Sequence, residues 1–289
     1  MIRILTDSTC DLLPKYLEKF DVEVLPLSVT FGDETFRDGV DLTHEEFYAR
    51  LANAEKLPTT AQIPPALFED AFRKHVEAGD EVLAILISSG ISGTYKSACI
   101  AKEAVGSDAV HVVDSRQATL SLGLLVHLAC LLRDNGKPVE EIERILNEIK
   151  KYARLWVIID TLKYLKMGGR VSPAASVVGE IMGIKPLVTM EEGAVAVAGK
   201  VRGKAAAIKW VLGRMHMQNK ADTHSAYVFG HTNAPESLEE FLDHFTLFTK
   251  TVIETRVGAV IGTHGGPGCI GVAYFETLPK DLQQVLAEG

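Results

Sequence analysis

The segment Ser88-Ser89-Gly90-Ile91-Ser92-Gly93-Thr94-Tyr95 lies between a predicted buried strand and a predicted helix. The residues before it, Val82–Ile87, form a nearly unbroken apolar run, which is typical of a strand covered on both faces. The residues after it, Tyr95–Val105, have apolar side chains at helical spacing. The segment offers hydroxyl groups, backbone N–H groups and the start of a helix, which together can bind one anion. It therefore indicates either a carboxylate or phosphate site or an ordinary turn with Ser/Thr helix caps.

Strands and helices alternate on both sides of this segment in the first half of the chain. The other predicted elements are strands at Ile2–Leu5, Val22–Phe31 and Val110–Val113, and helices at Leu12–Phe20, Thr43–Ala54, Leu67–Val76, Leu120–Asn135 and Val139–Tyr152. Asp7 and Asp11 flank the first strand-to-helix turn and are interpreted as caps of the first helix. The alternation predicts an α/β domain over residues 1–153, with a mostly parallel sheet that has helices on both faces.

The second half of the chain, residues 154–289, has a different pattern. Two predicted strands, Ile184–Met190 and Ala194–Val201, are separated by Glu191-Glu192-Gly193, which indicates a hairpin. Further strands are predicted at Leu155–Ile159, Ala226–Gly230, Thr251–Thr255, Val257–Ile261 and Ile270–Phe275, and helices at Pro173–Met182, Ala205–Met217 and Glu236–Phe248. A glycine-rich loop, residues 262–268, contains His264. We predict a second α/β domain with a mixed or largely antiparallel sheet.

Composition and charge exclude several classes of protein. The 289 residues include 30 Lys and Arg against 38 Asp and Glu, which gives a net charge of −8. No basic block is present, so sequence-independent binding to nucleic acid is not expected. The four cysteines are scattered and form no metal-binding motif, which favours free thiols in a reducing cytoplasm. The longest apolar run, Leu120–Leu132, is too short to span a bilayer.

Short motifs occur in a fixed order along most of the chain. They are Thr6-Asp7-Ser8 with Asp11-Leu12, Arg37–Asp41, Thr60 with Gln62, Ser88–Tyr95 with Ser97-Ala98, Asp114-Ser115, Tyr164–Arg170, Ile184-Lys185-Pro186 and Thr263–Gly268. This ordered set resembles the DegV family, including the FakB-type fatty-acid-binding proteins. The resemblance implies a two-domain α/β protein that holds one long-chain fatty acid in a closed cavity and performs no chemistry of its own. It also implies that the carrier presents the fatty acid to a fatty acid kinase, whose acyl phosphate product enters phospholipid synthesis.

The resemblance also implies roles for particular residues. Thr60 and Ser92 are expected to hold the carboxyl group, with the Gly93 N–H nearby, close to the interface of the two domains. Arg170 and His264 are expected near the same group. From the residues alone, Arg170 could be a charge at a helix C-terminus and His264 a loop histidine. The family usually has Thr-Ser-Gln-Pro-Ser around this threonine, whereas this chain has Thr60-Ala61-Gln62-Ile63-Pro64 and so lacks one hydroxyl group.

The acyl tail is expected to supply most of the affinity. Burying one CH₂ group contributes roughly 0.8 kcal/mol, so a chain of about 16 carbons contributes about 12 kcal/mol before entropic costs. Val177, Ile181 and Leu187 are the predicted tail contacts, because their segments are more apolar than one packed face requires. Packing in the protein core is the alternative interpretation of all three. No cofactor or metal is expected. The resemblance leaves chain length and oligomeric state open and is compatible with transient membrane contact.

Two enzyme classes are weighed against the carrier. Ser92, Asp114 and His264 occur in the order of the serine hydrolase triad, but the Gly-x-Ser-x-Gly elbow is absent. A phosphate-ligand or nucleotide enzyme would use the hydroxyl-rich segment, but the chain lacks a P-loop lysine and an obvious Mg²⁺ carboxylate cluster. A purely structural or interaction protein is the third alternative. The carrier interpretation accounts for more of the motifs than any of these.

Overall fold

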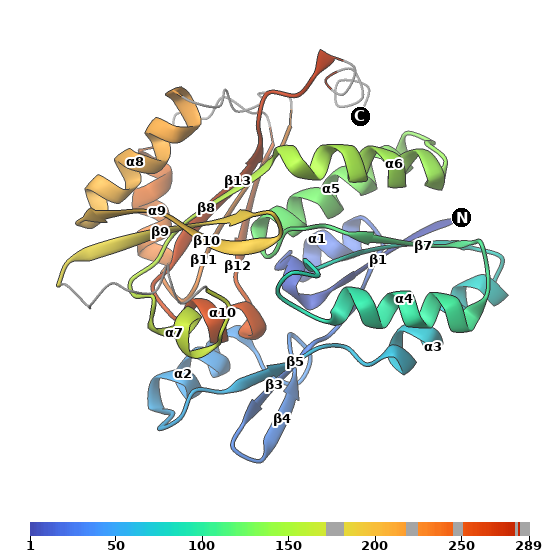
Figure 1. The fold of residues 1–289 in the computed structure, drawn as a ribbon, viewed down its shortest axis with the longest axis horizontal. Coiled ribbons are helices and arrows are strands. Elements are labelled where there is room, and N and C mark those ends of the chain that lie inside the picture. Colours follow the sequence, from blue (N-terminus) through green and yellow to red (C-terminus); the bar gives the residue numbers. More distant parts are fainter. Residues whose placement is uncertain (172–181, 218–224, 245–250, 281–282, 284–289) are drawn as a thin grey trace.

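A computed structural model describes residues 1–171, 182–217, 225–244, 251–280 and 283 (Figure 1). Its first sheet has the order β2-β1-β6-β7, and all of its strands are parallel. The strands are β1 (Ile2–Asp7), β2 (Val22–Leu25), β6 (Glu81–Leu86) and β7 (Val110–Asp114). Helices α3 (Pro65–Glu77) and α4 (Thr94–Val105) cover one face, and α5 (Leu120–Asp134) and α6 (Val139–Ile149) cover the other.

Strand β6 shows why this sheet is buried on both sides. Leu83 and Ile85 pack with the apolar residues of α5 and α6. Val82, Ala84 and Leu86, which point to the opposite face, pack with α3 and α4. Because side chains alternate along a strand, an unbroken apolar run supplies both faces. The predicted parallel sheet with helices on both faces is confirmed.

A small antiparallel sheet was not predicted. It has the order β4-β3-β5, formed by β3 (Ser28–Phe31), β4 (Glu34–Arg37) and β5 (Thr59–Ala61). The prediction of one strand over Val22–Phe31 is wrong, because β2 and β3 belong to different sheets and Pro26-Leu27 separates them. Helix α2 (His44–Asn53) follows, with a capping box between Thr43 and Glu46.

The second domain contains a mixed sheet of order β10-β9-β8-β13-β11-β12. Only the β11–β12 pair is parallel among the described pairs of this sheet; the others are antiparallel. The strands are β8 (Ala153–Ile158), β9 (Ile184–Glu191), β10 (Ala194–Arg202), β11 (Tyr227–His231), β12 (Val252–Arg256) and β13 (Ile270–Phe275). Helices α8 (Lys204–Met217) and α9 (Pro235–Asp243) pack against the sheet, and the predicted hairpin is present as β9–β10.

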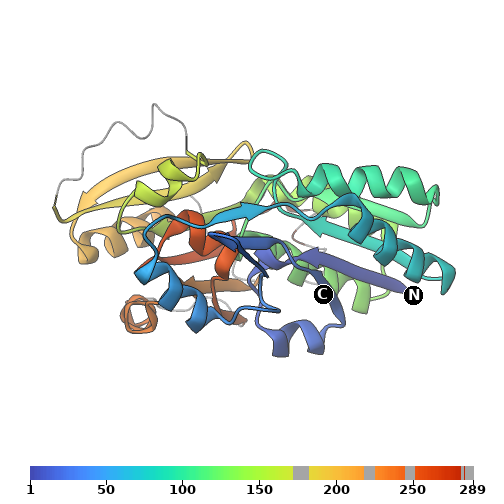
Figure 2. The same cartoon turned by 90° about the horizontal axis from the view of Figure 1, so that it is seen from below.

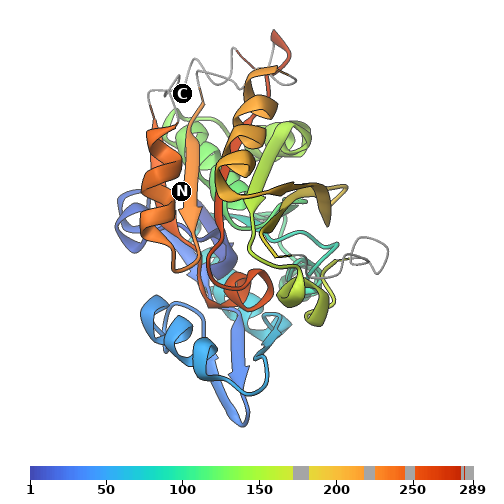
Figure 3. The same ribbon diagram turned by 90° about the vertical axis from the view of Figure 1, so that its left-hand side faces the viewer.

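The remaining described elements are short helices, and one of them replaces a predicted strand. Residues 259–261 of the predicted strand Val257–Ile261 and the first part of the predicted loop, up to Gly265, instead form helix α10 (Ala259–Gly265), which carries His264; the loop is present only after Gly265. Figure 3 shows α10 beside the small sheet, with which it makes direct contacts. The remaining helices are α1 (Pro14–Lys19), α7 (Lys163–Met167) and the 3₁₀ turns η1 (Ser8–Cys10) and η2 (Lys150–Tyr152). The predicted helix Pro173–Met182 lies outside the described residues except for Met182.

Helix α5 connects the two domains. It contacts β1 and β6 of the parallel sheet and also β8, β11 and β13 of the mixed sheet. One apolar cluster therefore runs from Ile4 and Leu83 through α5 to Val228 and Ala273. Figure 2 shows the two sheets side by side, with the helix in the region between them. The functional region described next lies beside this helix.

Candidate functional site

A cavity of about 400 Å³ lies between the domains. Its walls come from the carboxyl ends of the parallel strands, from the start of α5 and from the mixed sheet. Most of the lining side chains are apolar, among them Leu27, Ile87, Leu120, Leu155, Val188 and Met190. The volume falls in the ordinary range of small-molecule pockets.

All five residues predicted at the head group line this one cavity. Thr60 comes from β5, Ser92 and Gly93 from the turn before α4, Arg170 from the turn after α7, and His264 from α10. The structure therefore brings together residues that are up to 204 positions apart in sequence. Strand β5 pairs Thr60 with Val29 and fixes its position.

His264 and Thr60 form a polar pair in the cavity wall. Thr60 Oγ1 and His264 Nε2 are 2.8 Å apart. Burial, with a smaller effect from Arg170, lowers the pKa of His264 to about 4, so the imidazole is neutral at physiological pH. Its other nitrogen, Nδ1, is buried without a hydrogen-bond partner among the described residues. A Cβ at Gly168 would lie 2.2 Å from Nδ1, so glycine is required there.

Ser92 and Gly93 form another part of the polar wall. The Ser92 hydroxyl lies 2.9 Å from Thr94 Oγ1 and accepts a hydrogen bond from the Thr94 N–H at 3.2 Å. The Gln62 side chain covers Gly93 and donates from Nε2 to Ser97 Oγ at 2.8 Å. A Cβ at Gly93 would lie 1.8 Å from Gln62 Oε1. A side chain at this position would therefore displace the Gln62 amide group from its contact with Ser97.

The arrangement suits binding better than nucleophilic catalysis. The hydrolase triad is not formed, because Asp114 lies outside the cavity wall and accepts hydrogen bonds from the Ser89 N–H and Oγ at 3.1 and 2.5 Å. His264 is paired with Thr60 and Ser92 with Thr94. Neutral hydroxyl donors beside a single guanidinium are compatible with reversible binding of one carboxylate.

The predicted tail contacts have mixed outcomes. Val177 and Ile181 lie outside the described residues. Leu187 does not line the cavity; it is buried in the cluster that contains Ala207 and Val211 of α8, on the other face of the mixed sheet. Its neighbour Val188 lines the cavity instead, because adjacent residues of a strand point to opposite faces.

Sequence reasoning missed a pair of glycines that shapes the cavity. Gly230 of β11 and Gly271 of β13 are directly opposite each other in neighbouring antiparallel strands. A Cβ at Gly230 would lie 2.5 Å from Leu120 Cδ2, and one at Gly271 would lie 3.3 Å from Leu120 Cδ1. Leu120 therefore occupies the hollow that the two glycines leave. A glycine inside each predicted strand was the available signal for a close approach.

Three buried aspartates hold the backbone around the cavity. Asp7 Oδ2 accepts from the Ile87 N–H at 2.8 Å, where the hydroxyl-rich turn begins. Asp38 Oδ1 accepts from the Ala259 N–H at 2.9 Å, at the start of α10. Asp11 Oδ1 accepts from the Gly258 N–H at 2.7 Å, so its predicted role as a cap of the first helix is wrong. Burial raises the pKa of all three, that of Asp7 to about 6.

The described residues contain neither a candidate metal site nor a helix that could span a membrane. Within the ranges that the structure describes, no group of three or more His, Cys, Asp or Glu side chains is arranged to hold a metal ion. None of the helices in the described part of the chain has the length and apolar character needed to cross a bilayer.

Comparison with known proteins gives one consistent result. A family model described as "Uncharacterised protein, DegV family" matches residues 1–277. A DegV domain-containing protein of Clostridium acetobutylicum is 35% identical over 278 residues, covering 95% of this chain and 98% of the relative. A DegV lipid-binding protein of Thermotoga maritima has a TM-score of 0.87 at 29% identity, covering 96% of this chain and 99% of that one. A stearic-acid-binding protein of Eubacterium ventriosum has a TM-score of 0.86 at 31% identity, covering 96% and 98%.

Proposed function

The chain belongs to the DegV family, and from this premise we propose that it carries one long-chain fatty acid in the cavity between its domains. The observation that carries the proposal is the convergence of Thr60, Ser92, Gly93, Arg170 and His264 on one largely apolar cavity. The Thermotoga and Eubacterium proteins, which share the fold over nearly their whole length, bind lipid and stearic acid.

The affinity comes mainly from the tail and the orientation from the head group. Each buried CH₂ contributes roughly 0.8 kcal/mol. Each hydrogen bond from a hydroxyl to the carboxylate contributes about 1–3 kcal/mol. Thr60, Ser92 and the Gly93 N–H hold the carboxyl oxygens, while Arg170 supplies positive charge nearby. The neutral His264 imidazole fixes the rotamer of the Thr60 hydroxyl, with which it is already paired.

The protein acts as a carrier and presents the carboxyl group to a fatty acid kinase. Support for a carrier comes from the pairing of Ser92 with Thr94, which leaves this hydroxyl without an adjacent general base. The kinase role rests on the resemblance to the FakB-type proteins. In that role Arg170 and His264 place the carboxyl oxygen on the path of phosphoryl transfer.

Ligand capture is the first test. Mass spectrometry of the purified protein before and after solvent extraction should show about one fatty acid per chain. After lipid removal, titration with stearate or oleate should raise the melting temperature. Ser92→Ala should weaken binding by about 1–3 kcal/mol. Ser89→Ala is the matched control, because Ser89 belongs to the same turn but bonds to Asp114 outside the cavity wall. Absence of lipid together with no response to added fatty acid would refute the carrier.

Transfer to the kinase is tested separately. At saturating fatty acid, Arg170→Ala and His264→Ala should bind lipid nearly as well as the wild type but support much slower acyl phosphate formation. Displacing the carboxyl group should lower the rate of phosphoryl transfer more than the affinity for the fatty acid, because in-line transfer needs close positioning. Lys166→Ala removes a nearby exposed charge that does not line the cavity and serves as control. Wild-type rates for both variants would assign them a scaffold role only.

A further inference from the structure

The β9–β10 hairpin extends beyond the sheet to which it belongs. Its two strands pair with each other from base to tip. Among the described residue pairs, however, β9 pairs with β8 only at Leu187 and Val188. The part of the hairpin beyond Val188, residues 189–195, therefore forms an arm that leaves the mixed sheet. Figure 2 shows this arm beside the turn before α4, which belongs to the first domain.

The arm forms part of the cavity wall. Thr189, Met190 and Val195 lie on it and line the cavity. Thr189 and Met190 are buried, although the strand that carries them no longer pairs with β8 at these positions. The turn before α4, which carries Ser92 and Gly93, lines the same cavity. Moving the arm away from the first domain would therefore open the cavity between the arm and this turn.

Two polar side chains of the first domain hold the tip of the arm. Ser88 Oγ, where the turn before α4 begins, donates to the carbonyl oxygen of Gly193 at 2.6 Å. Arg116 Nη2 donates to the carbonyl oxygen of Glu192. We call these two hydrogen bonds, Ser88–Gly193 and Arg116–Glu192, the clasp. Both acceptors are backbone atoms, so the clasp depends on the path of the chain at the tip and not on its side chains.

Two glycines allow the tip to approach the first domain this closely. A Cβ at Gly90 would lie 2.4 Å from the carbonyl oxygen of Gly193. A Cβ at Gly193 would in turn lie 2.7 Å from Ser88 Oγ and 2.7 Å from Arg116 Nε. A side chain at either position would push the two backbones apart. Each backbone therefore lacks a side chain where the other one passes.

The backbone is strained on both sides of the clasp. Glu192 and Arg116 have φ angles of 48° and 56°, in the left-handed region that non-glycine residues rarely adopt. With Gly193 at 79°, both loop residues of the hairpin have a positive φ, as in a type I′ turn, which favours Asn or Gly over Glu. Such strain persists where surrounding contacts hold it, and it is frequent at ligand clamps and switch regions.

We propose that the arm is a gate through which the ligand enters and leaves, and that the clasp keeps this gate closed. The inference rests on the proposed function, since it assumes that a fatty acid occupies the cavity. Two other contacts of the arm must part when it opens: Val195 forms a bridge with Val171, and Met190 packs in the apolar cluster that includes α5. The pairing with β8 at Leu187 and Val188 remains and serves as the hinge.

Exchange rates test the clasp. Stopped-flow fluorescence measures uptake of cis-parinarate, a fluorescent fatty acid, by the delipidated full chain, and its release into excess albumin. Ser88→Ala and Arg116→Ala each remove one hydrogen bond of the clasp and should raise both rate constants by about fivefold. The Kd should change little, because the clasp joins two parts of the protein and is the same with and without ligand.

Two control variants leave the clasp intact. Ser89→Ala alters the same turn, but its hydroxyl bonds to Asp114 within the first domain. Glu192→Asn keeps the carbonyl oxygen that accepts from Arg116 and suits a positive φ. Both should exchange the fatty acid at wild-type rates. Faster release without faster uptake in the Ser88 and Arg116 variants would indicate a lost ligand contact and would overturn the inference.

A reversible covalent lock tests the gate directly. The Arg116 side chain reaches the Glu192 backbone, so a short bis-methanethiosulfonate linker can join Arg116→Cys to Glu192→Cys. Cys99→Ser is added, because Cys99 is the only natural cysteine that is not buried.

Linking should nearly abolish uptake and release, and a reductant that cleaves the linker should restore both. The same variant without the linker controls for the substitutions. Unchanged exchange after linking, verified by mass spectrometry, would overturn the gate and leave the carrier intact. Failure of the wild type to take up any fatty acid would refute the carrier and the gate together.

Discussion

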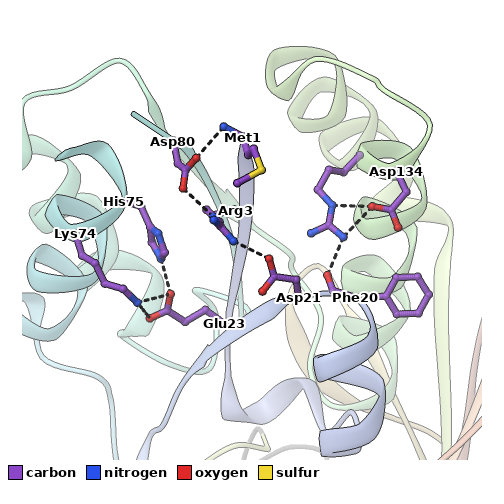
Figure 4. A network of polar contacts seen from close by, with 10 residues as sticks. Met1, Arg3, Phe20, Asp21, Glu23, Lys74, His75, Asp80 and Asp134 are labelled. Carbon is purple, nitrogen blue, oxygen red and sulfur yellow. Dashed lines mark hydrogen bonds and ion pairs between the residues drawn. The ribbon is translucent and has the colours of Figure 1, made fainter. Parts of the chain in front are cut away.

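The two edges of the parallel sheet carry different kinds of polar groups. At the edge where the strands begin, ionised side chains and the chain's own amino group pair with one another (Figure 4). At the edge where the strands end, hydroxyl groups, backbone N–H groups and buried carboxyls surround the cavity. Ligands of α/β proteins usually bind at the second kind of edge.

The first edge is rich in charge but satisfied within itself. The Met1 amino group and Arg3 Nε each lie 2.8 Å from an Asp80 oxygen. Beside them, Glu23 accepts from His75 Nε2 at 2.5 Å. Each of these groups has a polar partner, so the edge stabilises the sheet and offers little to a ligand. A high density of charged side chains therefore indicates a ligand-binding edge less well than neutral hydrogen-bond donors beside an apolar cavity do.

The largest effect is expected at the cavity edge. Leu120→Ala removes the side chain that fills the hollow over Gly230 and Gly271, and should lower the free energy of unfolding by about 2–5 kcal/mol. It should also shift fatty acid preference toward longer or bulkier chains. Leu122→Ala, at a buried position of the same helix that does not line the cavity, should destabilise similarly without that shift. Unchanged preference in both variants would remove Leu120 from the acyl-binding wall.

The pH dependence of the cavity edge should follow Asp7. Burial raises its pKa to about 6, from the ordinary 3.8, so the folded protein holds this proton more tightly than the unfolded chain. The Asp7 contribution is therefore greatest below about pH 4 and decreases as pH rises through 6, by about 2–3 kcal/mol. Urea unfolding of wild type and Asp7→Asn across this range should show a difference that grows in favour of the variant. A difference independent of pH would contradict this assignment, which NMR titration of the carboxyl group can check directly.

Asp38→Ala should have an intermediate effect at the same edge. It leaves the buried N–H groups of Ala259 and Val260 without their acceptor and should cost about 1–3 kcal/mol of stability. Because these groups begin α10, the His264 that the helix carries should shift and fatty acid binding should weaken. Asp38→Asn keeps an acceptor oxygen. It should therefore lose less stability, measured by chemical denaturation, and less fatty acid affinity, measured by ligand titration. Equal losses for the two variants would argue against a capping role.

The smallest effect belongs to the ion-pair edge. The Met1 amino group and Arg3 lower the pKa of Asp80 to about 2, below its usual 3.8. Its contribution to stability is therefore complete above about pH 4 and is lost as pH falls toward 2, opposite to that of Asp7. Asp80→Asn should lower the melting temperature slightly at neutral pH and flatten the acid limb of the curve. Fatty acid binding should be unaffected, and a loss of binding would break the contrast between the edges.

Much of the fold was predictable because buried helices and strands have a characteristic spacing of apolar residues in the sequence. The apolar run of β6 and the bounds of β13 were predicted, as was the hairpin β9–β10. The short strands β4 and β5 were missed, since strands of three or four mostly polar residues are too short to show a hydrophobic period. Helix α10 was taken for a strand because Val257–Ile261 contains β-branched residues, whereas distant carboxyls at Asp11 and Asp38 cap a helix there.

The candidate site was predicted from motif order rather than from periodicity. Thr60, Ser92 and His264 come from segments whose proximity no local pattern encodes, and the family resemblance brought them together. The wall at Leu120 was missed because it depends on a glycine pair in two strands. Such a feature follows from tertiary packing and has no signature in a single segment.

Helix α5 has a consequence for how the molecule melts. The helix packs against both sheets, so neither sheet can unfold without exposing part of the helix's packed surface. We therefore expect the two domains to unfold together as one cooperative unit. Calorimetry should show a single transition whose measured enthalpy equals the van't Hoff enthalpy. A fatty acid held in the cavity should move this transition upward as a whole and should not divide it in two.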